Sequence, residues 1–252
     1  MTDIQPWYTE WFNSPYYHQL YFERNQAEAT KFIDNLVGWL KPAQESLILD
    51  IACGKGRHSI ELASEGFDVT GIDLAPDSIL EAKQHEKDNL HFFVHDMRLP
   101  FWINYFDYAF NFFTSFGYFD TQREHNNAIR TVAQSLKENG IFVIDYLNVF
   151  YAEEHLIPTS EVKDKGVTYQ LSRWTDQHHF HKKIVVQDET LTSPLEFQEK
   201  VAKFSLNDFT EMLSHQQMQV QDVFGDYNFS NYHAEKSPRM IIVAKKLAAN
   251  IQ

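Results

Sequence analysis

The chain has 252 residues, of which 43% are hydrophobic and 23% charged, so it can bury a full core and disorder is not expected. Its formal net charge of −13 argues against a nucleic-acid partner, because a phosphate backbone is bound mainly by Lys and Arg. A single cysteine rules out an internal disulfide, and the sequence shows neither an export signal nor an apolar run of about 20 residues, which predicts a soluble, cytoplasmic protein without a membrane segment.

The first segment, residues 1–45, is expected to form helices that pack on the rest of the chain as a cap. Its first 22 residues are rich in aromatic side chains, which must cover an apolar surface. From residue 46 the sequence alternates between short apolar runs and helical patterns, as in a parallel sheet with helices on its faces. These patterns predict strands at 46–51, 67–73, 90–95, 106–112 and 141–147, with helices at about 57–64, 76–84 and 121–137.

After residue 151 the pattern changes to period two. Apolar and polar residues alternate around Tyr169, Ile184 and Phe197, which is typical of antiparallel strands with one face in water. Ser205 then caps a helix to about His215, and the last two strands are predicted at about 218–226 and 239–245. We therefore expect an α/β fold, a doubly wound, mostly parallel seven-stranded sheet with an antiparallel β insertion and an N-terminal helical cap. The core is predicted from 46–154 and 205–252, and the insertion from 155–204.

The first predicted strand ends in a loop suited to a ligand. Asp50 precedes a tight turn through Gly54 and Gly56, and a helix begins at Arg57. Such a turn exposes backbone N–H groups at a helix N-terminus, and its glycines allow close approach to the backbone. The second strand ends in Asp73, whose carboxylate could accept hydrogen bonds from both hydroxyls of a ribose.

A third element, Asp96-Met97, follows the third strand, where an acidic residue could bind the amino group of an adenine while Met97 lines its ring. A single glycine turn after a strand is often only a turn, but three elements in this order indicate a nucleoside-type cofactor. A dinucleotide loop would have a third glycine where this chain has Ser59. That difference disfavours an NAD-dependent oxidoreductase, which we keep as an alternative.

The segment from Leu47 to Gly56 resembles the first motif of the class I S-adenosylmethionine-dependent methyltransferases. The segments 71–75 and 96–97 resemble the second motif and the adenine-contacting third, and 111–113 is similar to the segment that borders the methyl group. The resemblance implies a Rossmann-like methyltransferase fold, with S-adenosylmethionine as cofactor and S-adenosylhomocysteine as product. Ala52 departs from the glycine more usual there, and we expect it to need a negative φ.

The same resemblance implies roles for individual residues. It places Asp50 near the methionine amino group, Asp73 on the ribose, and the backbone of Ala52 and Gly54 against the cofactor. Arg57 would face the methionine carboxylate or, equally, be a solvated residue in the first helical turn. Further residues expected around the cofactor are Leu74, Asp96, Met97, Asn111, Phe112, Phe113 and Cys53, the last as a small packing residue rather than a nucleophile.

In the N-terminal segment, Tyr17, Tyr21 and Arg24 lie on one face of a predicted helix. This segment resembles the cap of small-molecule members of the superfamily, so the three residues are candidates for closing over the cofactor. The alternative is ordinary amphipathic packing of the tyrosines.

The loop 113–119 lies at the carboxyl edge of the sheet, where ligands bind in open α/β folds, and we expect it to touch the acceptor. Tyr118, Tyr146 and His233 are candidates for orienting the acceptor or removing its proton, although most tyrosines and histidines serve packing or lie at the surface.

Three histidines, His178, His179 and His181, suggest a metal site, but only the last two share a strand face. We expect no acidic or thiol partner near them, so we predict no metal and place them at solvated strand positions. The charge run 196–203 alternates with apolar residues and is predicted to be a sheet face in water.

The leading function is transfer of a methyl group by in-line displacement to a small-molecule acceptor, which could be an amine, a hydroxyl or a carboxylate. Displacement from a sulfonium carries its own driving force, so the protein mainly positions the nucleophile, excludes water and removes a proton. A cofactor-binding protein of this fold without turnover is an alternative, because fold does not fix function. An edge of the inserted sheet could pair with a second copy, which would give a homodimer.

Overall fold

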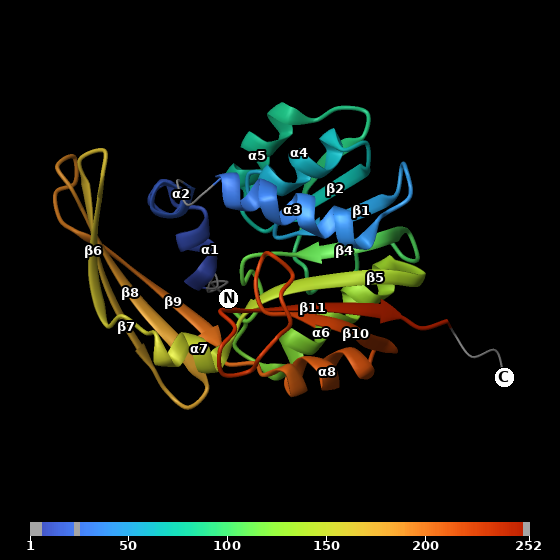
Figure 1. Cartoon of the computed structure of the whole chain (residues 1–252). Coiled ribbons are helices and arrows are strands. Elements are labelled where there is room, and N and C mark those ends of the chain that lie inside the picture. The colour runs from blue at the N-terminus through green and yellow to red at the C-terminus, as the bar shows by residue number, and fades with distance from the viewer. Residues whose placement is uncertain (1–6, 23–25, 249–252) are drawn as a thin grey trace, which may run out of the picture.

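The strands of the protein form two separate sheets in the computed structural model, which describes residues 7–22 and 26–248 (Figure 1). The larger sheet has seven strands in the order β10-β11-β5-β4-β1-β2-β3. Its strands are β1 (Leu47–Ile51), β2 (Asp68–Asp73), β3 (Leu90–Val94), β4 (Phe106–Asn111), β5 (Leu136–Leu147), β10 (Met218–Phe224) and β11 (Arg239–Lys246). Only the pairings of β11, with β10 and with β5, are antiparallel. The predicted mostly parallel seven-stranded sheet is confirmed.

Helices cover both faces of this sheet. They are α3 (Gln26–Leu40), α4 (Arg57–Ser64), α5 (Pro76–Ala82), α6 (Gln122–Ser135) and α8 (Leu206–Ser214). The short η1 (Lys83–His85) follows α5, and the short α7 (Val149–Glu154) follows β5. Consecutive residues of β1 show why the sheet is doubly wound. Ile48 packs with residues of α3, α4 and α5, whereas Leu49 packs with residues of α6 and α8. Since both faces of this central parallel strand are covered, every residue of β1 except Asp50 is apolar, and Asp50 is itself buried near the strand's carboxyl end.

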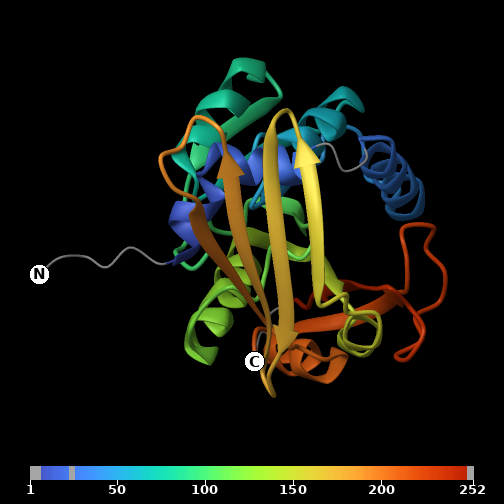
Figure 2. The same ribbon diagram turned by 90° about the vertical axis from the view of Figure 1, so that its left-hand side faces the viewer.

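The second sheet lies beside the core and carries the first two helices on one face (Figure 2). It is antiparallel, in the order β6 (Thr159–Asp164), β7 (Val167–Thr175), β8 (His179–Asp188) and β9 (Leu195–Ala202). Trp11 of α1 (Trp7–Phe12) and Leu20 of α2 (Pro15–Phe22) are buried against Tyr169 and Leu171 of β7. The aromatic residues at the start of the chain therefore cover the inserted sheet. The division of the chain into a cap (1–45), a core (46–154 and 205–252) and an insertion (155–204) remains a proposal.

Several elements differ from those predicted, among them α7, which no predicted element covers. Strand β6 was not predicted, because Val162 is its only large apolar residue and an edge strand with exposed positions shows no apolar period. Helix α6 ends at Ser135 rather than near Lys137, since Leu136 is already extended and pairs with Phe106 before the register shifts. Among the described residues no helix has both the length and the apolar character needed to cross a bilayer.

Candidate active site

A cavity of about 490 Å³ lies where β1, β2, β3 and β4 end. Its walls come from the loops after these strands, from α1 and α2, and from β9 of the inserted sheet. Ligands of open α/β sheets bind at this carboxyl edge. Most of the predicted cofactor residues line the cavity, namely Tyr17, Tyr21, Asp50, Ala52, Cys53, Gly54, Arg57, Asp73, Leu74, Asp96, Met97, Phe112 and Phe113, as does the predicted acceptor residue Tyr118.

The turn after β1 is built from three residues with left-handed backbone. Gly54 and Gly56 have φ of 56° and 80°, and Ala52 has φ of 59°. The expectation of a negative φ at Ala52 is therefore wrong. The N–H of Cys53 donates to the carbonyl of Ile72 at 3.0 Å, and this bond to the neighbouring strand holds the turn beside Ala52. A left-handed alanine is strained, and the family's usual glycine would avoid that strain.

Two buried carboxylates order this end of the sheet. Asp50 accepts a hydrogen bond of 2.5 Å from the hydroxyl of Ser59, the residue that stands where a dinucleotide loop has glycine. Asp73 accepts from the backbone N–H groups of Gly54 and Ala75, both at 2.8 Å. Burial raises the pKa of Asp50 to about 6 and also raises the pKa of Asp73. A cationic or hydroxyl-bearing ligand would stabilise these carboxylates in their ionised form.

The N-terminus of α4 faces the same cavity. Gly56 is its N-cap and has no side chain that could cap the helix, and the partial positive charge of this helix end favours an anionic group. Arg57 lines the cavity, with its guanidinium carbon 5.5 Å from the centre of the Phe113 ring. His58 stacks on that ring with centroids 5.1 Å apart, and burial lowers the pKa of His58 to about 3. His58 therefore contributes a neutral ring rather than a cation.

Asp96 lines the cavity but is already paired. Both of its carboxylate oxygens accept from Arg98, at 2.6 to 3.1 Å, and the guanidinium also binds Glu124 at 2.5 Å. The hydrogen bonds from Arg98 hold the pKa of Asp96 below its usual value despite burial. An adenine amino group would have to share this carboxylate with Arg98.

Three of the predicted site residues that the structure describes do not line the cavity. Tyr146 is fully buried and its hydroxyl donates to the carbonyl of Ala202 at 2.5 Å, so it packs the core instead of contacting an acceptor. His233 is exposed in the loop before β11, where its N–H donates to Ser237. Asn111 is buried beneath the site and donates to the carbonyl of Ile51 at 3.1 Å. Arg24 lies outside the described residues.

A carboxylate that the sequence analysis missed, Glu199 of β9, lines the cavity from the opposite sheet. Its Oε1 accepts from the indole N–H of Trp11 at 2.8 Å and from the hydroxyl of Tyr21 at 2.6 Å, and Lys182 lies 3.5 Å from Oε2. The side chain is only 12% exposed, so the predicted wet face is wrong at this position. The sequence did contain a clue. Glu199 lies two residues from both Phe197 and Val201, so its side chain points to the same face of the strand as these apolar residues.

Tyrosine rings connect the two halves of the cavity. Burial, together with the carboxylates of Glu199 and Asp73, raises the pKa of Tyr17. Burial and Glu199 also raise the pKa of Tyr118. Both phenols are therefore neutral at physiological pH, and they form an aromatic wall with Phe12, whose ring lies 5.0 Å from each. Such a wall suits a desolvated cation.

The donors and acceptors of the cavity fit S-adenosylmethionine. Asp50 and Asp73 offer carboxylates to an ammonium and a ribose, the positive N-terminal end of α4 and Arg57 favour a carboxylate, and aromatic rings surround the space between them. A family model described as a methyltransferase domain matches residues 44–199, more than half of the chain. The chain belongs to the S-adenosylmethionine-dependent methyltransferases. This membership sets aside the NAD-dependent oxidoreductase alternative.

Solved structures share the fold of this methyltransferase. An S-adenosylmethionine-dependent methyltransferase from Clostridium acetobutylicum superposes with a TM-score of 0.77 at 18% identity, covering 92% of this chain and 96% of that one. The sugar N-methyltransferase KedS8 from a Streptoalloteichus species superposes with a TM-score of 0.72 at 19% identity, covering 92% and 93%.

Among curated sequences, glycine N-methyltransferase of Oryctolagus cuniculus is 28% identical over 163 residues, which are 56% of this chain and 52% of that enzyme. This methyltransferase thus spans about half the length of that relative.

Proposed function

We propose that this methyltransferase transfers the methyl group of S-adenosylmethionine to an amine on a small molecule by in-line displacement. The cofactor supplies an electrophilic methyl group on a positively charged sulfur. Transfer breaks the carbon–sulfur bond, forms a carbon–nitrogen bond, and releases S-adenosylhomocysteine and a proton. The protein's part is to hold the amine in line and to exclude water.

The observation that carries the choice of an amine is the carboxylate of Glu199 in the cavity wall. A carboxylate that is largely withdrawn from water favours a nearby cation and disfavours a nearby anion. Lys182 supplies part of that cationic charge at 3.5 Å, so an acceptor ammonium would share Glu199 with it. The position of Tyr17 near the carboxylates of both Glu199 and Asp73 supports an acceptor site next to the cofactor site.

Among the three acceptor classes, a carboxylate is the least favoured, because Glu199 would repel it. A hydroxyl acceptor needs a base strong enough to draw off its proton, and burial lowers the pKa of His18 to about 4 and of His58 to about 3. An amine, in contrast, needs no strong base, because an ammonium is far more acidic than an alcohol and its neutral form carries the lone pair that attacks. Two of the similar proteins, the sugar N-methyltransferase KedS8 and glycine N-methyltransferase, both methylate nitrogen, which lends further support.

The test measures formation of S-adenosylhomocysteine by the purified protein with three matched acceptor sets. These are small aminosugars, the same sugars with a hydroxyl in place of the amine, and the corresponding sugar acids. We expect product from the amines. Product from only the hydroxyl or acid set would overturn the amine assignment. No product from any set, with the cofactor still bound, would favour the alternative of a cofactor-binding protein without turnover.

The variant Glu199→Gln sharpens this test. It keeps the shape and hydrogen-bonding capacity of the side chain but removes its charge, so we expect KM for the amine to rise roughly tenfold or more while the Kd of S-adenosylmethionine stays unchanged. Glu196→Gln is the matched control, since Glu196 lies on the same strand, is 61% exposed and pairs with Lys183. Equal effects of the two substitutions would contradict a direct role of Glu199 in the site.

A further inference from the structure

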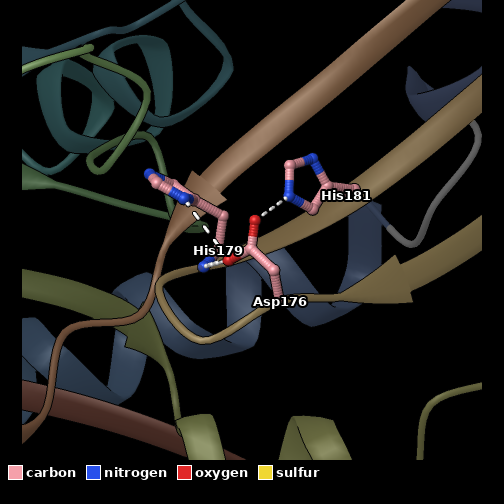
Figure 3. A group of neighbouring side chains, drawn as sticks. All are labelled: Asp176, His179 and His181. Atoms are coloured by element: carbon pink, nitrogen blue, oxygen red, sulfur yellow. Dashed lines mark hydrogen bonds and ion pairs between the residues drawn. The ribbon is translucent and has the colours of Figure 1, made fainter.

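The turn between β7 and β8 brings together an aspartate and two histidines that lie outside the methyl-transfer cavity (Figure 3). His179 and His181 are on one face of β8, and Asp176 comes from the turn. One ligand atom from each of the three side chains lies within 4.8 Å of the others. The expectation of no acidic partner near these histidines is wrong, because Asp176 lies beside both His179 and His181.

The hairpin itself holds the three side chains in place. Oδ1 of Asp176 accepts the backbone N–H groups of His178 and His179, each at 2.7 Å, and this fixes the carboxylate. Its Oδ2 is 2.7 Å from Nε2 of His181, and Nδ1 of His179 is 3.6 Å from Oδ1. The ring of Trp174 stacks on His181 with an interplanar angle of 5° and fixes that imidazole from the other side.

We propose that Asp176, His179 and His181 form a binding site for a divalent transition-metal ion, best suited to Zn²⁺. Two imidazoles and one carboxylate are the donor set that such ions take in proteins, with further positions filled by water. The side chains are 21–51% exposed, so both the ion and its water ligands can reach them. Binding replaces the hydrogen bond between His181 and Asp176 with two bonds to the metal.

Nearby positive charge does not oppose this site strongly. Lys200, beside His179, pairs with Asp120 at 2.7 Å, and Lys203 pairs with Glu153 of α7 at 2.5 Å. Lys203 also donates to the backbone carbonyl of Asp176. The site thus lies where the end of the inserted sheet is tied to the core, and a bound ion would stiffen that junction.

The experiment titrates tag-free, chelator-treated protein with Zn²⁺ in a calorimeter and with Co²⁺ in a fluorimeter and absorption spectrometer. We expect one ion per chain, quenching of Trp174 by Co²⁺ that is lost in Trp174→Phe, and a higher melting temperature with Zn²⁺. His181→Gln and Asp176→Asn should each weaken Zn²⁺ binding roughly tenfold or more. The absence of stoichiometric binding by the wild-type protein would overturn the proposal.

His178→Gln is the matched control, because His178 lies in the same turn but outside the set of three. It should leave the affinity for Zn²⁺ and the Co²⁺ spectrum unchanged. If it weakens binding as much as His181→Gln does, the histidines act as a nonspecific cluster and the proposal fails. Circular dichroism and melting curves of the metal-free variants check that each one folds, so a loss of binding can be assigned to the missing ligand.

Discussion

The backbone N–H of Gly54 donates a 2.8 Å hydrogen bond to Oδ2 of Asp73, which joins the loop after β1 to the end of β2. The other oxygen of Asp73 accepts from the N–H of Ala75, also at 2.8 Å. One carboxylate therefore orders two turns and faces the cavity at the same time. Removing it should affect both the shape of the cofactor loop and the ligand that this loop holds.

Asp73→Ala is expected to raise the Kd of S-adenosylmethionine about 10- to 100-fold, because it deletes a charged acceptor worth roughly 1.5–3 kcal/mol and leaves two N–H groups without a partner. Asp73→Asn keeps one acceptor oxygen, so its Kd for S-adenosylmethionine should lie between those of the wild type and of Asp73→Ala. Calorimetric titration with S-adenosylmethionine and S-adenosylhomocysteine measures both. Asp68→Ala, at the other end of β2, is the control, and equal affinities for the Asp68 and Asp73 variants would refute the prediction.

Binding of S-adenosylmethionine should weaken in acid. Burial raises the pKa of Asp50 to about 6, so the carboxylate is ionised above that pH and protonated below it. A cationic amino group prefers the ionised form, and affinity should therefore fall as the pH drops through 6, by up to about tenfold per pH unit. Calorimetry in buffers of different ionisation enthalpy should detect proton release near pH 6.

The raised pKa of Asp50 has the opposite effect on the folding stability of the ligand-free protein, which should be greater in acid. A buried acid with a raised pKa favours folding most when it is protonated, and this contribution is lost as the pH rises through about 6. Asp50→Asn should remove both pH effects and weaken cofactor binding at pH 8. An unchanged pH profile in this variant would assign the titration to another group.

Ala52→Gly is expected to stabilise the protein. Left-handed backbone costs an alanine roughly 1–2 kcal/mol, whereas the extra freedom of glycine in the unfolded chain costs about 0.4–1 kcal/mol. The net gain in unfolding free energy should be about 1 kcal/mol, measured by urea denaturation. Ala63→Gly in α4 is the matched control and should lose at least about 1 kcal/mol. A loss of stability in Ala52→Gly would show that the methyl group packs favourably.

A buried network supports the loop that lines the cavity after β4. Asp145 accepts from the N–H of Phe113 at 2.8 Å and from Arg239 at 2.8 Å, and Arg239 also donates to the hydroxyl of Thr114 at 2.9 Å. Phe113 and Thr114 both have left-handed backbone, with φ of 57° and 59°. Arg239→Met should cost about 3 kcal/mol or more of unfolding free energy, because it leaves a fully buried carboxylate without its cation.

The control for this network is Lys137→Met, which breaks a 2.8 Å pair with Asp107 whose partners are 41% and 34% exposed. An exposed pair contributes less than about 1 kcal/mol. The unfolding free energy of each variant can be measured by chemical denaturation. Similar losses in Arg239→Met and Lys137→Met would mean that Arg239 contributes no more than an exposed ion pair does. Because Phe113 lines the cavity, Arg239→Met should also weaken cofactor binding.

Much of the core could be predicted because its strands are short apolar runs that end at polar or glycine residues. Asp50 and Asp73 were found in this way, since strand ends in a parallel sheet meet at one edge. The edge strand β6 carries only Val162 as a large apolar residue and left no such pattern. Tyr146 could not be assigned from sequence, because its direction depends on contact with Ala202, a residue of the other sheet.

Charged residues inside the fold were the hardest to predict. Glu199 and Asp145 are both acidic residues in strands, and sequence alone gives a solvated position as the default. Their actual surroundings come from Trp11, Tyr21 and Arg239, which are far away in the chain. The proposed homodimer stays a prediction.

The hydrogen bond between Trp11 and Glu199 spans 188 residues, and this separation sets the order in which the protein can assemble on the ribosome. Helices α1 and α2 are synthesised before the sheet on which they rest, and that sheet is not complete until translation has passed Ala202. The aromatic start of the chain must therefore remain without its partner surface while the first half of the core folds. The part of the cavity wall that α1 and α2 form is therefore made before the cofactor loop but can be seated only after β9, so a chain halted before β9 would have its cofactor loop without this cover.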